Sequence, residues 1–157
     1  VPEAATQVYA QLNTRWDKLD RAGRFDAQRR MYRLQIAQEE RLAVEHPEKI
    51  LLLDRGTVDG AAYWPGGPDG FWPDVGTTRP AAMARSDAVL WLESCAALGL
   101  YDGDASNACR FEDPAAAIRS GKALLTLWGD HPHLHRIGAF VDLADKFAAV
   151  METINSL

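Results

Sequence analysis

The stretch Ile50-Leu51-Leu52-Leu53-Asp54-Arg55-Gly56-Thr57 decides the predicted fold. Its four apolar residues do not alternate with polar ones, which is typical of a strand buried on both faces of a parallel sheet. Two further apolar runs follow, at 88–92 and 134–137. Helical patterns separate the three runs, so the sequence predicts crossover connections and an α/β domain of three layers, a parallel sheet flanked by helices.

The predicted helices come from apolar periodicity and capping residues. They cover 4–20, 26–46, 79–85, a helix from Asp113-Pro114 to about residue 129, and a last helix after residue 138. An Asp before a Pro is typical of an N-cap followed by the first helical residue. The last helix has apolar residues on one face: Phe140, Ala144, Phe147, Ala148, Met151 and Ile154. A loop rich in Gly and Pro fills 56–78.

Composition limits the class of protein and its partners. The 157 residues are 47% hydrophobic and 25% charged, as in one globular domain, and the net charge is −5. An acidic chain of this kind lacks the basic surface that nucleic acids need, so we expect no nucleic-acid partner. No apolar run is long enough to span a membrane. The two cysteines, Cys95 and Cys109, fit reduced thiols, and we expect a cytoplasmic protein.

The residues after the first apolar run are the first candidates for chemistry, because ligands bind at the carboxyl ends of parallel strands. Asp54 could hold Mg²⁺ beside nucleotide phosphates. Arg55 could complement the charge of a transferring phosphoryl group. A structural role is the alternative, since an Asp that caps the end of a strand is common.

Two other features suit a planar or nucleoside-like ligand. Gln38 lies on the apolar face of the helix predicted over 26–46, where its amide either bonds to backbone or recognises a base edge or an amide-bearing ligand. The loop that contains Tyr63, Trp64, Phe71 and Trp72 gathers four aromatic rings. These rings either stack on a ligand or fold back together as a small core.

Several of these segments together resemble a known family. They are Val1-Pro2-Glu3-Ala4-Ala5, the stretch 50–60 with Tyr63-Trp64, Arg110-x-Glu112, Trp128-x-x-His131-Pro132, and the last helix with Lys146. The combination resembles the P-loop ATPase/kinase family of the AAA-domain type, which includes relatives of bacterial nicotinamide riboside kinase. The resemblance covers most of the chain.

This resemblance implies a P-loop NTPase-like fold and kinase-like phosphoryl transfer from ATP, with Mg²⁺, to a small nucleoside-like molecule. Glu3 matches the position of a general base near the substrate hydroxyl, with Asp54 and Arg55 opposite the phosphates. Arg110 matches an arginine on a lid over the transferring phosphate. Arg119 and Lys122 are further lid candidates, and Gln38, Tyr63 and Trp64 are the substrate candidates.

The chain departs from the family at its start. The Walker A loop, G-x-x-x-x-G-K-[ST], and the first strand have no counterpart after Val1. We therefore expect a truncated member of the family that is inactive in this form. An absent strand exposes the edges of its neighbours, so the chain is predicted to form a homo-oligomer through those edges.

Two other functions are open at this point. One is a non-catalytic binding or interaction domain, which fits the missing phosphate loop. The other is a metal-dependent hydrolase, because His131, His133 and His135 share one face of an extended segment and Asp130 and Asp142 lie nearby in the sequence.

Overall fold

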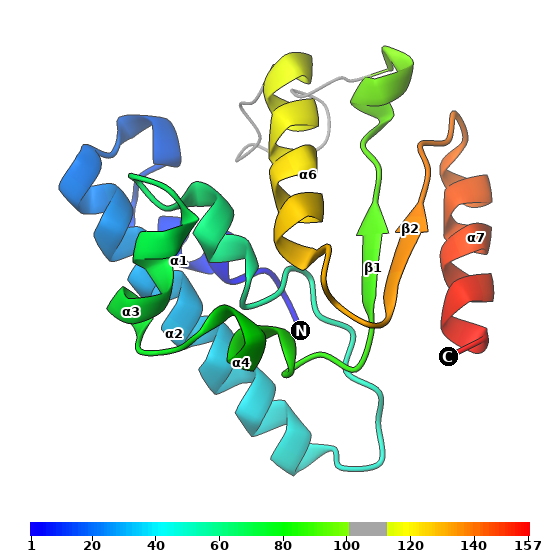
Figure 1. Cartoon of the computed structure of the whole chain (residues 1–157), viewed down its shortest axis with the longest axis horizontal. Helices are drawn as coiled ribbons and strands as arrows, with labels where there is room; N and C mark the ends of the chain where they lie inside the picture. Colours follow the sequence, from blue (N-terminus) through cyan, green and yellow to red (C-terminus); the bar gives the residue numbers. More distant parts are fainter. Residues whose placement is uncertain (101–112) are drawn as a thin grey trace. The chain divides into compact units, whose positions relative to one another are not determined.

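The computed structural model describes residues 1–100 and 113–157. It divides into two compact units, Val1–Arg85 and Ser86–Leu157. In Figure 1, which is coloured along the sequence, the first unit runs from blue to green and the second unit ends in red.

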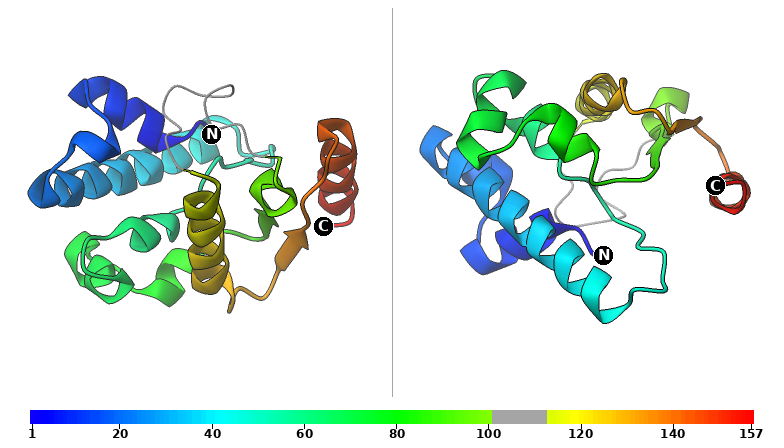
Figure 2. Two further views of the ribbon diagram at one scale, coloured as in Figure 1. Left: turned by 90° about the horizontal axis from the view of Figure 1, so that it is seen from above. Right: turned by 60° about the horizontal axis from the view of Figure 1, so that its bottom comes forward.

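Two packed helices form the base of the first unit. Helix α1 spans Ala4–Leu12 and helix α2 spans Arg21–Glu45, with a 3₁₀ turn, η1, at Trp16–Lys18 between them. Their contact is built from apolar side chains: Ala4 and Val8 of α1 pack with Ala27 and Met31 of α2. Figure 2 shows the two helices side by side. Asp20 caps α2 by accepting a bond from the Gly23 amide at 2.7 Å.

The second half of this unit is a chain of short helical turns. These are η2 at Asp59–Tyr63, η3 at Pro68–Gly70, α3 at Phe71–Val75 and α4 at Arg79–Met83. The turns between residues 59 and 75 surround the fully buried Phe71, which meets Trp64 and Trp72 edge to face. The loop predicted over 56–78 is therefore ordered around an apolar side chain.

The segment 50–53 is paired with the start of the chain and with nothing else among the described residues. The Val1 amino group donates to the Leu52 carbonyl at 2.6 Å, and the Asp54 amide donates to the Val1 carbonyl at 3.0 Å. These two bonds form one rung of a parallel ladder, with Val1 opposite Leu53. Ile50 and Leu52 stay 81% and 61% exposed. Self-association through this edge stays a prediction.

The second unit contains a parallel pair of strands. β1 (Val89–Leu92) pairs with β2 (Leu134–Ile137), with Val89 opposite Leu134 and Leu92 opposite Ile137. The 3₁₀ turn η4 (Cys95–Leu98) follows β1. The strands lie between α6 (Pro114–Trp128) and α7 (Leu143–Asn155), as Figure 1 shows. The predicted cap is confirmed, because Asp113 accepts a bond from the Ala116 amide at 2.6 Å.

The predicted three-layer P-loop sheet is wrong. Among the described residues the structure has one sheet of two strands, and most of these residues are helical, so the fold is a small mixed α/β fold. The runs predicted at 88–92 and 134–137 contain the strands β1 and β2, and the parallel orientation predicted for the sheet holds for this pair. The run at 50–53 is not a strand of a sheet, because a single rung with Val1 does not build a sheet.

The apolar face predicted for the last helix is also placed differently. Phe147 is 65% exposed, Ala144, Ala148 and Met151 are exposed, and no residue of α7 is buried. The half-buried residues of α7 include Lys146, whose ammonium donates to the Glu93 carbonyl at 2.7 Å. Periodicity located this helix but not the side that packs.

Nowhere in ranges 1–100 and 113–157 does a helix combine the length and the hydropathy that crossing a membrane requires.

Candidate functional site

Arg55 has an unusual backbone conformation for a residue with a side chain. Its φ is +80°, in the left-handed region that side chains with a Cβ rarely adopt. The Arg55 carbonyl accepts a bond from the Gln35 side-chain amide at 3.2 Å, which fixes this conformation from the middle of α2. Strained residues of this kind persist where the surroundings hold them, and they are concentrated at functional sites.

The Arg55 side chain lies among acidic groups. Its Nε is 3.4 Å from Glu3 Oε1, and its Nη1 is 3.9 Å from Asp59 Oδ2. Burial on its own lowers the pKa of the guanidinium, but the acidic groups around it raise its pKa overall: Tyr63, Asp59, Glu3 and Asp54. Arg55 therefore stays protonated and provides a fixed positive charge.

Glu3 is held at the start of α1, where it precedes the first helical residue. Its Oε2 accepts a bond from the Thr6 hydroxyl at 2.8 Å, and its Oε1 faces Arg55. The next residue on this face, one turn further along α1, is Gln7. Gln7 Oε1 accepts a bond from Gln38 Nε2 at 3.0 Å.

Two hydrogen bonds, an ion pair and the spacing of helical residues place five residues together, which we call the polar ring: Glu3, Gln7, Gln38, Gln35 and Arg55. Glu3 and Gln7 are neighbours on α1, and Gln35 and Gln38 are neighbours on α2. Gln7 bonds to Gln38 on one side, while Arg55 joins Gln35 to Glu3 on the other. Three segments far apart in the sequence thus bring a carboxylate, a guanidinium and three amides together.

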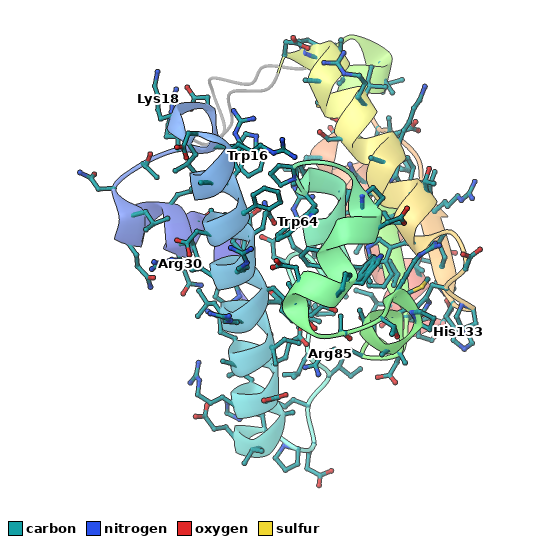
Figure 3. All side chains as sticks on the ribbon, turned by 60° about the vertical axis from the view of Figure 1, so that its left-hand side comes forward. Trp16, Lys18, Arg30, Trp64, Arg85 and His133 are labelled. Atoms are coloured by element: carbon teal, nitrogen blue, oxygen red, sulfur yellow. The ribbon has the colours of Figure 1, made fainter. Side chains whose placement is uncertain are left out.

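The Gln35 side chain is also bonded to an ion pair, formed by Glu39 and Arg85. Gln35 Nε2 also donates to Glu39 Oε1 at 2.9 Å, and Glu39 Oε2 accepts two bonds from Arg85, at 3.1 and 2.9 Å. Glu39 is buried and Arg85 is partly exposed, where the chain leaves α4 (Figure 3). Because both hydrogens of the Gln35 amide are used, its position and that of the Arg55 carbonyl are fixed.

The predicted site residues fall into three groups. Glu3, Arg55 and Gln38 are brought together in the polar ring, and the exposed Asp54 and the half-buried Tyr63 act electrostatically on Arg55. Arg119 is exposed on α6 in the second unit, as is Lys122. Arg110 lies outside the described residues.

Trp64 belongs to the aromatic core and not to the ring. Its indole is edge-on to Phe25 at 4.6 Å and to Phe71 at 5.4 Å between ring centroids, and only 7% of the residue is exposed. Figure 3 shows it between α2 and the short helices of the loop. The aromatic loop therefore folds back on itself, which is one of the two alternatives that the sequence left open.

Five residues at or beside the site were missed by sequence reasoning: Gln7, Gln35, Glu39, Asp59 and Arg85. A signal was present for two of them. Gln35, Gln38 and Glu39 share one face of α2, with Gln28 two turns before Gln35, so polar residues recur where an apolar stripe is expected. Asp59 and Arg85 carry no such signal, because their partners lie on other segments.

The residues present do not fit ATP with Mg²⁺. Asp54 on its own could bind Mg²⁺ only beside phosphates that are held in place. The glycine-rich segment 66–78 has no lysine, and Gly121-Lys122 lies inside α6. The described ranges contain no group of three His, Cys, Asp or Glu side chains placed to hold a metal ion. The proposed chemistry therefore has no step through ATP or Mg²⁺.

The three histidines form no metal site either. His131 Nδ1 accepts a bond from the His133 amide at 3.2 Å, so Nε2 carries the hydrogen and donates it to the Ser86 carbonyl at 2.9 Å. Both ring nitrogens of His131 are thus engaged. His133 is exposed at the surface of the second unit (Figure 3), and His135 lies on β2.

Chemically, the polar ring offers a base beside a fixed cation, with amides one helical turn away. A carboxylate close to a guanidinium can take a proton from a ligand hydroxyl, and the amides can bind a donor or acceptor edge. No protein-family model, curated protein or solved structure matches this chain.

Proposed function

We propose that the first unit binds a small nucleoside-like molecule at the polar ring and presents one of its hydroxyl groups for kinase-like phosphoryl transfer. The observation that carries the proposal is Arg55, strained at φ +80°, pinned by Gln35 and set against Glu3. The resemblance implies ATP as the donor. Because the described residues do not fit its phosphates, the proposal is confined to the acceptor side.

Glu3 takes the role of general base in this proposal. Its carboxylate is partly exposed, so a ligand hydroxyl can reach it, and the Thr6 hydroxyl holds one of its oxygens. Glu3 accepts a hydrogen bond from that hydroxyl, which orients the hydroxyl oxygen and places its proton next to the base. Arg55, which stays protonated, stabilises the negative charge that gathers beside it.

A non-catalytic binding domain is the second candidate. The poor fit of ATP to the described residues favours it, and it uses the same ring and the same ligand class. The two candidates differ in one result, which is whether a nucleoside monophosphate forms when MgATP is added. Mass spectrometry of the mixture detects that product directly.

The first test is calorimetric titration with adenosine, cytidine, uridine and nicotinamide riboside. We expect at least one to bind, and we expect Glu3→Ala to weaken its binding about tenfold or more, because a hydrogen bond to a charged group is lost. Glu45→Ala is the matched control, since Glu45 is an exposed carboxylate at the C-terminal end of α2 that pairs with Arg41 and lies outside the ring.

Two results would contradict the proposal. One is that none of the four nucleosides binds. The other is that Glu3→Ala and Glu45→Ala have the same small effect while circular dichroism shows both variants folded.

A further inference from the structure

The Gln38 side chain has a polar group that no described residue satisfies. Gln38 is only 9% exposed, and its Nε2 donates to Gln7 Oε1 at 3.0 Å. Its Oε1 is buried and has no hydrogen-bond partner. Buried carbonyl groups are nearly always paired, because leaving water without a replacement bond is unfavourable.

Rotating the Gln38 amide by half a turn still leaves one of its polar atoms without a partner. If Gln38 and Gln7 both exchanged their amide nitrogen and oxygen, Gln38 Oε1 would gain the bond, and Gln38 Nε2 would then be the group without a partner. The open position beside Gln38 therefore needs a partner in either orientation.

The neighbouring glutamine shows what a purely structural amide looks like in this ring. Gln35 uses Nε2 twice, toward Glu39 and toward the Arg55 carbonyl. Gln38 lies three residues further along the same face and has a single bond. The side-chain nitrogen of Gln35 therefore makes two hydrogen bonds to the protein, whereas Gln38 makes one and keeps an unpaired oxygen.

We propose that Gln38 recognises the base edge of the ligand, through an amino or primary amide group. Its Oε1 accepts an N–H of the ligand, and the second hydrogen of Nε2 is available to an adjacent acceptor. Glutamine binds paired donor–acceptor edges such as the N6 and N7 of adenine in this bidentate manner. This inference rests on the proposed function and names the chemical class within it.

The spacing of the ring defines the ligand further. Gln7 lies one turn of α1 beyond Glu3, about 6 Å along the helix. A ligand that meets both Glu3 and Gln38 needs a hydroxyl and an amino or amide edge separated by at least that distance. A nucleoside provides both, whereas a free base or a free ribose provides one.

Two matched pairs of nucleosides test this inference by calorimetry without ATP. Adenosine is compared with purine riboside, which lacks the amino group, and nicotinamide riboside with nicotinic acid riboside. We expect the amino- or amide-bearing member of at least one pair to bind tenfold or more tightly. Gln38→Met is expected to reduce that preference to about twofold or less. Gln28→Met is the control, because Gln28 is a buried glutamine on the same helix outside the ring.

A second variant keeps the test decisive if Gln38→Met does not fold. Gln38→Glu has nearly the same shape and keeps the acceptor for the ligand N–H, so it is expected to retain the preference, whereas the loss of the donor weakens the binding of both members of a pair. Equal binding within both pairs, a preference that survives in folded Gln38→Met, or a preference that is lost in folded Gln38→Glu, would overturn the inference. Glu3-dependent binding with no preference would overturn this inference alone, whereas no binding at all would overturn the proposed function too.

Discussion

The two units bury their aromatic and apolar side chains very differently. In the first unit, a loop rich in Gly and Pro closes around Phe71, which is fully buried against Tyr32, Trp64 and Trp72. In the second unit, the regular helix α7 has no buried residue, and Phe147 is 65% exposed. The irregular loop therefore buries its aromatic side chain more completely than the regular helix α7 does.

Regular secondary structure therefore does not indicate which segment of this protein is best packed. The loop is fixed because its rings meet edge to face and because Arg29, stacked near Trp64, also binds Asp74 at 2.6 Å. Helix α7 satisfies its backbone hydrogen bonds internally, and its packing is limited to half-buried residues such as Lys146. We therefore expect the ligand site to lie in the first unit, which contains the well-packed aromatic loop.

The largest expected effect compares one phenylalanine from each unit. Phe71→Ala removes a fully buried ring and should lower the free energy of unfolding by about 3–5 kcal/mol. Phe147→Ala truncates an exposed ring and should change it by about 0.5 kcal/mol or less. Urea unfolding followed by circular dichroism measures both. Similar losses in the two variants would mean that α7 is covered by a partner in solution.

A smaller effect tests the strain at Arg55. Arg55→Gly and Arg55→Ala both remove the guanidinium, but only alanine keeps the Cβ that makes φ +80° unfavourable. The glycine variant should therefore be more stable than the alanine variant by about 1 kcal/mol. Chemical denaturation of the two variants side by side gives this difference. Equal stabilities would show that the left-handed backbone at residue 55 is absent in solution.

The fold could be predicted from the sequence where local chemistry determines it. Asp113 before Pro114 marked the start of α6, and the apolar runs marked β1 and β2 and their parallel pairing. The partner of 50–53 could not be predicted, because the rung that this segment forms among the described residues joins positions 1 and 53, which are far apart in the sequence. Apolar periodicity cannot count the strands of a sheet, so the three-layer architecture did not follow from it.

The candidate site was predicted in part. Glu3 came from the resemblance, Arg55 came from its place after an apolar run, and Gln38 came from its place on the apolar face of a helix. Their proximity depends on Gln35, which holds the Arg55 carbonyl across twenty residues of sequence. No local pattern encodes such a contact, because each partner has several alternatives in the unfolded chain.

The most direct test of the polar ring as a ligand site is nuclear magnetic resonance of its side chains during a titration with adenosine and nicotinamide riboside. We expect one of them to shift the side-chain amide signals of Gln38 and Gln7 and the Arg55 Nε–H signal. The Met151 methyl signal on α7 should stay in place. Shifts confined to the second unit, or no shift of Gln38 at saturating nucleoside, would contradict the account.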